Sequence, residues 1–382
     1  MTAPTQILPE EHAQAAPPRQ PRLYVLDGLR LVAAVMVLFG HWVGTGAYGG
    51  GPPVWGEQAE HVFPTAMVAT ASFGWSGVAL FFLISGFVIC MSSWDRDLAS
   101  FARSRIVRLL PAYWVCVLLT TACLAVTAGR GVDLVELFSG AVTNLTMVQK
   151  GYGVSHIDPV YWTLWSELKF YLLFAVVVFF GLTYRRVVTF CWLWMIAATL
   201  AQASGEPLLS EILQPRYAAY FIAGIAFYLI RRFGPTLMLW LMIATSFAVA
   251  QNQIQSFASS EIKAMRWHFP LWGILLLLFG YFVLMALVAL GGLDVVTGRW
   301  LVTAGALTYP LYLLHQVIGL EAIHFLHSRI PAYPLLAGMF VGMLLLAYLV
   351  HVLVEKPGGR RLHREITRSY EAMRRPEREP AA

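Results

Sequence analysis

Apolar stretches of about twenty residues recur along the whole chain and constrain its fold more than any other feature. A helix needs about 20 apolar residues to cross the hydrocarbon core of a bilayer. Only 13% of the residues are charged, so little of the chain suits a soluble surface. The sequence therefore predicts an all-α membrane protein with about ten transmembrane helices. The expected spans are 24–45, 74–93, 111–129, 162–183, 187–203, 216–232, 236–252, 268–290, 303–327 and 335–355.

The basic residues between these stretches predict the orientation of the chain. An even number of spans places both termini on one side, and 19 of the 27 lysines and arginines then fall on that side. Cytoplasmic loops carry the excess of Lys and Arg, so both termini are expected in the cytoplasm. The expected location is the inner (plasma) membrane, as a multi-pass protein. Because the net charge of +6 arises from these short clusters, no nucleic-acid partner is expected.

Three regions are expected along the chain. Residues 1–22 are rich in Pro, Ala and Gln and predict a disordered cytoplasmic tail. Residues 23–357 form the membrane domain, and 358–382 form a basic cytoplasmic tail that meets anionic lipid headgroups. The four cysteines lie in apolar runs without CxxC spacing, so no metal site is expected. The sequence indicates no oligomeric state.

Charged and titratable side chains inside the apolar stretches mark candidate functional positions, because they are costly to keep in a bilayer. Arg30 and His41 lie eleven residues apart in the first stretch. At ~100° and ~1.5 Å per residue they share one helix face, about 16 Å apart. Asp27 can pair with Arg30 at i, i+3. The alternative is an Arg30 that snorkels to the interface, beside a His41 that is simply packed in the core.

Two further polar sets lie deeper in the chain. Glu167 falls inside the fourth stretch, where it either handles protons or pairs with a cation on another helix. Thr308, Tyr312 and His315 share one face of the ninth stretch, at i, i+4 and i+7. Ser85, in the second stretch, is expected to serve helix packing rather than catalysis.

Six short motifs follow one another along these stretches. They are LDGLR at 26–30 followed by His41, GVALFFLISGF at 77–87, RSRIVRLLPAYW at 103–114, WTLWSELKFY at 162–171, TYPLYLLH at 308–315 and EKP at 355–357. Together they resemble the acyltransferase type 3 family of integral membrane acyltransferases, over nearly the whole membrane domain. The chain departs from the family pattern at Leu168 and Lys169, where the family usually has Glu and Gln. Only Glu167 is therefore carried over from that motif.

The resemblance implies an O-acyltransferase that moves an acyl group, often acetyl, from cytoplasmic acyl-CoA to a hydroxyl group. Sugars of surface polysaccharides or of lipopolysaccharide O-antigen are the expected acceptors, and small secondary metabolites are an alternative. Acyl-CoA is then a substrate, and no permanently bound cofactor is expected. A transporter or flippase for a lipid-linked glycan is the competing function class. A haem held by His41 and His315 is a further alternative.

The expected orientation assigns the donor side of this reaction to a set of arginines. Arg103, Arg105 and Arg108 lie on the cytoplasmic side, where their guanidinium groups are placed to bind the phosphates of acyl-CoA. Arg30, part of the way into the membrane, is expected to meet the pyrophosphate or the thioester arm.

His41 lies further along the same helix face and is therefore expected near the thioester carbon. It is expected to act as the general base on the acceptor hydroxyl, or as the nucleophile that carries the acyl group briefly. His315 or Glu167 is expected to orient His41 or to relay its proton.

Overall fold

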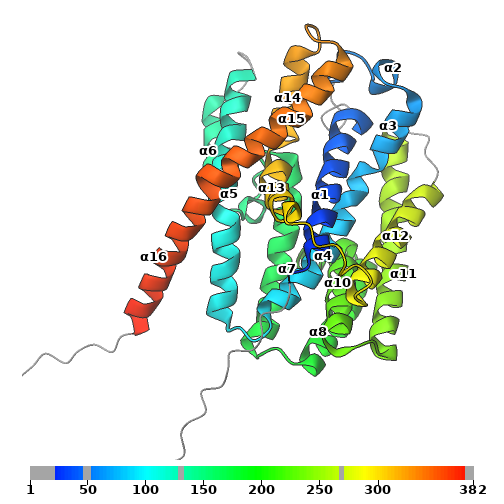
Figure 1. Ribbon diagram of the computed structural model, residues 1–382, viewed down its shortest axis with the longest axis vertical. Helices are drawn as coiled ribbons and strands as arrows, with labels where there is room; N and C mark the ends of the chain where they lie inside the picture. Colours follow the sequence, from blue (N-terminus) through cyan, green and yellow to red (C-terminus); the bar gives the residue numbers. More distant parts are fainter. Residues whose placement is uncertain (1–21, 46–52, 128–132, 266–270, 375–382) are drawn as a thin grey trace, which may run out of the picture.

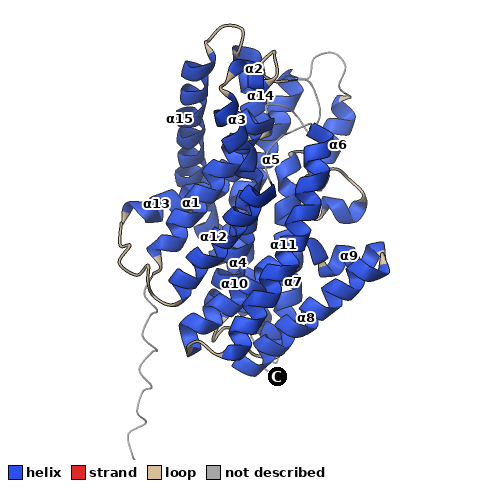
Figure 2. Ribbon diagram, turned by 90° about the vertical axis from the view of Figure 1, so that its right-hand side faces the viewer, coloured by secondary structure: helices blue, strands red, loops and turns tan. Residues whose placement is uncertain are grey.

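The computed structural model describes residues 22–45, 53–127, 133–265 and 271–374. These residues form helices joined by loops, without a sheet (Figure 2). The prediction of an all-helical membrane protein is thereby confirmed. All but the last residue of the expected tail at 1–22, and the last residues of the chain, 375–382, lie outside the described residues.

Eight helical segments in the described part of the chain are long and apolar enough to cross a bilayer. They are Tyr24–Thr45, Thr65–Ser93, Leu98–Thr127, Pro159–Phe179, Tyr184–Ser204, Leu237–Ser256, Leu271–Ala289 and Ala332–Met373. The helices Trp300–Leu314 and Val317–Leu326 add a ninth if they are counted as one span with a 68° bend.

The remaining expected span, 216–232, is the helix α10 (Pro215–Phe233), which does not meet the same criterion. Arg216, Arg231 and Arg232 lie near its ends, so every window of 18 residues contains more than two charges. All of its residues from 218 to 230 are nevertheless buried. α10 is therefore surrounded by protein within the bundle, and its burial does not depend on contact with lipid.

The helices that carry the candidate residues are α1 (Tyr24–Phe39), its π-helical continuation η1 (Gly40–Thr45), α4 (Gly77–Ser93), α5 (Leu98–Thr127), α7 (Trp162–Phe179), α13 (Trp300–Leu314) and α14 (Val317–Leu326). The others are α2 (Ala59–Val62), α3 (Thr65–Ser72), η2 (Phe73–Ser76), α6 (Leu134–Asn144), η4 (Gln149–Tyr152), η5 (Pro159–Tyr161), α8 (Tyr184–Ser204), α9 (Pro207–Leu213), α11 (Leu237–Met265), α12 (Leu271–Ala289), α15 (Ala332–Val350), η6 (His351–Glu355) and α16 (Lys356–Arg374).

The third span starts earlier than the sequence predicts. A proline commonly opens a helix, which placed the start of the span at Pro111, yet α5 is one helix of 30 residues with Pro111 inside it. A proline in a helix leaves the carbonyl of the residue four positions earlier without its N–H partner. Here that residue is Val107, and α16 packs beside it through Gly358 and Gly359.

Basic ends of several helices gather at one end of the bundle. Arg232 pairs with Asp95 after α4 at 3.3 Å, and Arg231 pairs with Asp294 after α12 at 2.8 Å. The helix α16 continues α15 and runs away from the end where α2 and the α14–α15 connection lie (Figure 1). The segments that follow α4, α10 and α12 therefore lie at one end of the bundle. Which side of the membrane they face stays a prediction.

Glycines let α10 and α4 cross at very short range in the centre of the bundle. A Cβ atom added to Gly86 would lie 2.1 Å from the carbonyl oxygen of Phe221, and one added to Gly224 would lie 2.1 Å from that of Leu83. Small residues allow this close backbone approach between membrane helices. The crossing keeps α4, which carries Ser85, in contact with the buried face of α10.

Candidate active site

A cavity of about 90 Å³, termed the inner cavity, lies among α1, α4, α5, α7 and α13. Its charged lining consists of three arginines and one carboxylate: Arg30, Arg105, Arg108 and Glu167. Ser85 and the hydroxyls of Tyr171, Thr308, Tyr309 and Tyr312 add polar groups. The excess of guanidinium groups makes the inner cavity suited to an anionic ligand.

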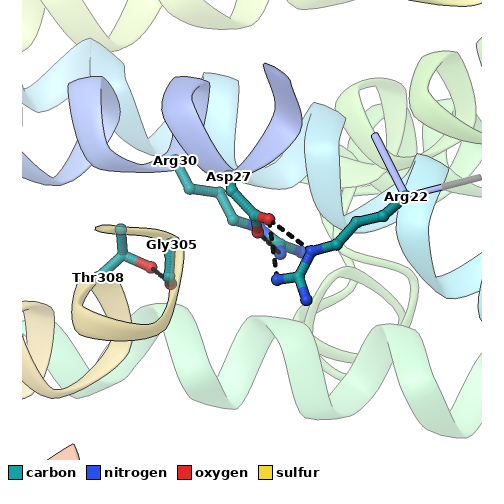
Figure 3. Close-up of polar contacts among 5 residues, drawn as sticks. All are labelled: Arg22, Asp27, Arg30, Gly305 and Thr308. Carbon is teal, nitrogen blue, oxygen red and sulfur yellow. Dashed lines mark hydrogen bonds and ion pairs between the residues drawn. The ribbon is translucent and has the colours of Figure 1, made fainter. Parts of the chain in front are cut away.

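Arg30 belongs to a small ionic cluster at the start of α1. The carboxylate of Asp27 lies between two guanidinium groups, with Arg22 at 2.9 Å and Arg30 at 3.9 Å (Figure 3). Gly305 of α13 makes room for this carboxylate, because a Cβ there would lie 2.5 Å from Asp27 Oδ1. The predicted i, i+3 pairing of Asp27 and Arg30 is present. Arg30 reaches the inner cavity rather than the lipid, and its side chain is only 14% exposed.

Glu167 faces the inner cavity and is held by a residue of α4. The hydroxyl of Ser85 donates a hydrogen bond of 2.5 Å to Glu167 Oε1. This contact gives Ser85 a place in the site that the sequence did not predict, since small residues in α4 also serve packing. Glu167 is not among the hydrogen-bond partners of His41, so the structure favours His315 over Glu167 as the group that orients His41.

The three arginines of α5 separate into two sets. Arg105 and Arg108 line the inner cavity, and Arg105 also donates to Ser92 at 2.9 Å. Arg103 does not line this cavity; it donates to Thr367 of α16 at 3.2 Å and to Ser100 at 3.4 Å. Arg105 and Arg108 are three residues apart and share a helix face, whereas Arg103 turns toward the C-terminal helix.

Lys169, one of the departures from the family pattern, points away from the inner cavity. Its ammonium group lies 2.9 Å from Glu211 Oε1, at the edge of α9. Burial acts to raise the pKa of Glu211, but hydrogen bonds from Lys169 and Trp165 outweigh it and hold the pKa below its usual range. The prediction that Lys169 and Glu167 face different ways is consistent with these contacts.

A second cavity of about 500 Å³, termed the outer cavity, adjoins the inner cavity. Three side chains line both cavities and are termed the wall: Val78, Phe82 and Tyr312. His41 borders the outer cavity, together with the stacked rings of Trp162 and Tyr217, whose centroids are 5.0 Å apart. Arg30 and His41 therefore line two adjoining cavities.

The local backbone contributes to this difference. The chain is α-helical from Tyr24 to Phe39 and π-helical from Gly40 to Thr45. His41 therefore lies in a wider turn than the regular α-helix assumed when its spacing from Arg30 was estimated from the sequence. Gly40 packs against Gly74, because a Cβ added to Gly40 would lie 3.2 Å from the Cα atom of Gly74. Single π-turns of this kind occur often at functional sites.

His41 and His315 form a direct hydrogen bond, with Nδ1 of His41 3.0 Å from Nε2 of His315. The Nδ1 atom of His315 lies 2.8 Å from the carbonyl oxygen of Tyr312, which can only accept. His315 must therefore carry its proton on Nδ1, and in its neutral form it accepts at Nε2. His41 then donates from Nδ1 and keeps a lone pair on Nε2. This arrangement selects the tautomer that a general base requires.

The bend between α13 and α14 brings His315 to this position, and two buried side chains satisfy its broken backbone. Trp42 donates from Nε1 to the carbonyl oxygen of His315 at 2.8 Å. Asp158 accepts from the backbone N–H of Val317 at 3.2 Å and from that of Val160 at 3.1 Å. One carboxylate thus caps both α14 and the start of the α7 segment. Sequence reasoning missed Asp158, since an Asp before Pro is an ordinary helix-start signal.

The loop that leads to Asp158 carries a further, partly buried polar contact, outside the predicted spans. Nε2 of Gln149 lies 2.7 Å from Nδ1 of His156. Burial, and after it the charge of Lys150, lowers the pKa of His156 to about 4. Asn144 holds the same loop by donating to the carbonyl oxygen of Ser155 at 3.0 Å. His156 is therefore neutral in the folded loop at neutral pH.

The histidine pair does not suit a haem held between the two rings. Two axial bonds of about 2 Å on opposite faces of the iron would separate the ring nitrogens by about 4 Å, which exceeds the 3.0 Å found. Within the described residues, no group of three or more His, Cys, Asp or Glu side chains is arranged to hold a metal ion.

These features define a polytopic membrane protein with a histidine pair at its larger outer cavity and a basic inner cavity beside it. The family Acyl_transf_3, described as an acyltransferase domain, matches residues 23–352. The chain belongs to this family, and the resemblance seen in the six sequence motifs is confirmed.

Curated relatives match shorter parts of the chain. The chain is 29% identical over 194 residues to Acyltransferase MdmB of Streptomyces mycarofaciens, which is 49% of this chain and 46% of that protein. It is 35% identical over 167 residues to Nodulation protein 10 of Rhizobium leguminosarum bv. viciae, which is 38% of this chain and 41% of that protein. The chain thus covers less than half the length of these relatives. No solved structure matches it.

Proposed function

We propose that the chain is a membrane O-acyltransferase that moves an acyl group from acyl-CoA to a hydroxyl held in the outer cavity. The observation that carries this proposal is the His41–His315 hydrogen bond, which leaves a basic nitrogen of His41 at the outer cavity. On the far side of the wall lie three arginines, which suit the phosphates of acyl-CoA. Family membership supports the reaction class.

The donor side of the proposal rests on the charges of the inner cavity. Arg105 and Arg108 bind the phosphates, and Arg30, held by Asp27, lies further along toward the thioester. Acetyl-CoA is the proposed donor. Arg103 has no direct role in this scheme, because it bonds to α16 instead.

In the proposed reaction, the acceptor oxygen attacks the thioester carbonyl carbon while Nε2 of His41 takes the hydroxyl proton. The C–S bond then breaks, and the leaving CoA sulfur receives that proton from His41. The Nδ1 proton of His41 stays in its hydrogen bond to His315 throughout, so His315 acts as a positioning residue. A brief acyl-imidazole on His41 is the alternative course of the same transfer.

The proposed acceptor is a ring-shaped molecule with free hydroxyls, such as a sugar of a surface polysaccharide or O-antigen. The outer cavity has a volume of about 500 Å³, within the range of small-molecule sites, and the Trp162–Tyr217 pair offers an aromatic face. Arg216 and Gln253 add polar groups to its lining. A small secondary metabolite is the alternative acceptor of the same chemistry.

The proposed location is the inner membrane, with both termini in the cytoplasm. The gathering of basic loops at one end supports this orientation, because cytoplasmic loops carry the excess of positive charge. The inner cavity, which Arg105 and Arg108 line near the start of α5, then opens toward the compartment that contains acyl-CoA.

The proposal is tested with purified protein in lipid nanodiscs, by measuring CoA release from acetyl-CoA with surface glycans as acceptors. His41→Gln is expected to lower the rate by about 10²–10⁴, the usual contribution of a positioned general base. His324→Gln, which changes an exposed histidine of α14, serves as the matched control. Near-normal transfer by His41→Gln contradicts the assignment. Glycan movement without acyl transfer identifies a transporter instead.

A further inference from the structure

A third cavity lies on the outer side of the α7–α8 hairpin and shares no lining residue with the inner or outer cavity. Its volume is about 580 Å³. Apart from Arg185, Arg186 and Thr189, its lining is apolar. α8 and α9 lie along one edge of the bundle (Figure 2). We term this cavity the hairpin groove.

The hairpin groove faces the surroundings of the bundle rather than its core. Val176 of α7 is 56% exposed, Phe180 at the end of that helix is 63% exposed, and Leu193 of α8 is 62% exposed. In a chain with eight or nine candidate spans, exposed apolar side chains at this depth meet lipid chains. The natural occupant of such a groove is therefore a hydrocarbon chain.

The length of the groove is close to the thickness of one leaflet of the bilayer. It extends along α8 from Arg185 to Ala197, and the helix rises about 18 Å between these two residues at ~1.5 Å per residue. One leaflet contributes about half of the ~30 Å hydrocarbon core. A single lipid chain can therefore lie in the groove from the membrane surface to the middle of the bilayer.

Positive charge is fixed at the surface end of the groove. Arg186 donates from Nη1 to the carbonyl oxygens of Phe180 at 2.5 Å and of Gly181 at 3.0 Å, which holds its guanidinium group across the end of α7. Arg185 lies beside it and is exposed, at the first turn of α8. No acidic residue lines the groove. Arginines placed in this way recognise phosphate groups.

We propose that the hairpin groove binds one anionic phospholipid of the surrounding leaflet, with its phosphate at Arg185 and Arg186 and one chain along α7 and α8. A zwitterionic lipid places a cation against the same two arginines and binds less well. Occupancy supports α7 from the lipid side, opposite the face that carries Glu167 to the inner cavity. The site is independent of the acyl transfer proposed above.

Native mass spectrometry tests the proposal after reconstitution with phosphatidylglycerol and phosphatidylcholine of identical chains. The unaltered protein is expected to retain one phosphatidylglycerol in preference to phosphatidylcholine. Leu193→Trp fills the groove and is expected to abolish retention. Leu200→Trp is the matched control, because Leu200 is 63% exposed on the same helix and lies outside the groove.

The charge requirement is tested separately. Arg185→Gln is expected to lower phosphatidylglycerol retention about fivefold, the effect of one basic residue near an anionic headgroup. Arg299→Gln changes an exposed arginine outside the groove and is expected to have no effect. Equal retention of both lipids, or equal retention by Leu193→Trp and Leu200→Trp, overturns the proposal.

Discussion

Nδ1 of His41 lies 3.0 Å from Nε2 of His315, although 274 residues separate them in the chain. The first comes from a π-helical turn at the end of α1, and the second from the bend between α13 and α14. Both are departures from regular α-helix. The carbonyl oxygen of Tyr312 then sets the tautomer of the whole pair through Nδ1 of His315.

A double-mutant cycle on this pair tests the positioning role of His315. His315→Ala is expected to lower kcat, because His41 loses the acceptor that fixes its tautomer. Combining it with His41→Ala is expected to cost no more than His41→Ala alone, since both changes remove one function. Steady-state kinetics of the four proteins measures this. Additive losses would show that His315 acts separately from His41.

Arg105→Gln and Arg108→Gln are each expected to raise KM for acyl-CoA by roughly tenfold to a hundredfold. The reason is the loss of one charged hydrogen-bond donor, worth about 1.5–3 kcal/mol. Arg103→Gln is the control, because Arg103 bonds to Thr367 and Ser100 away from the inner cavity. An equal rise of KM in the control would place the donor phosphates at α16 instead.

Gly86→Ala and Gly224→Ala are expected to destabilise the protein by about 1–3 kcal/mol or to prevent folding, as overpacking does. Each new methyl group would lie 2.1 Å from a carbonyl oxygen of the facing helix. Gly280→Ala of α12 is the control, since nothing lies within 4 Å of its added Cβ. Thermal unfolding in detergent measures the difference. Equal melting temperatures for all three variants would refute the close crossing.

Asp158→Ala is expected to destabilise the protein by about 1–3 kcal/mol, because it removes the buried carboxylate that accepts hydrogen bonds from the N–H groups of Val160 and Val317. It is also expected to lower kcat, since the bend that carries His315 loses its cap. Asp133→Ala, which removes the exposed cap of α6, is the control and should leave kcat unchanged. Asp158→Asn keeps one oxygen acceptor and should retain part of the stability and part of kcat. An unchanged kcat in Asp158→Ala would show that the cap does not help to position His315.

The loop at His156 is expected to loosen in mild acid. The lowered pKa of about 4 lies below the value of ~6.5 in an unfolded chain, so the unfolded form binds the proton first. Stability from the partly buried neutral ring is therefore complete above pH ~6.5 and is lost as the pH falls toward 4. Hydrogen exchange of residues 145–157, corrected for intrinsic rate, should rise over this window. His156→Gln should remove this pH dependence of hydrogen exchange. If the exchange rate of the variant still rises in mild acid, a titratable group other than His156 causes it.

Much of the local organisation could be predicted from the chain alone. The apolar stretches predicted the helices, because a bilayer requires every backbone group to be satisfied within its own segment. Spacing placed Arg105 and Arg108 on one face and turned Lys169 away from Glu167, and the structure agrees with both. The motifs identified the family, whose match covers residues 23–352.

Other features depend on contacts that no local pattern contains. Arg103 belongs to the same basic motif as Arg105, yet its partner is Thr367 on a helix that follows much later. Pro111 predicted a helix start, and α16 accommodates it within α5. The partnership of Ser85 with Glu167 joins two helices that periodicity describes only one at a time.

The sequence by itself determined the class of protein and the candidate residues, because bilayer insertion depends on local hydrophobicity and charge. Only the tertiary structure decided which of them meet. His41 pairs with His315 and Glu167 with Ser85, because helix crossings at glycines and a bend capped by Asp158 set distances over hundreds of residues. The wall of Val78, Phe82 and Tyr312 likewise exists only after α4 and α13 have packed together.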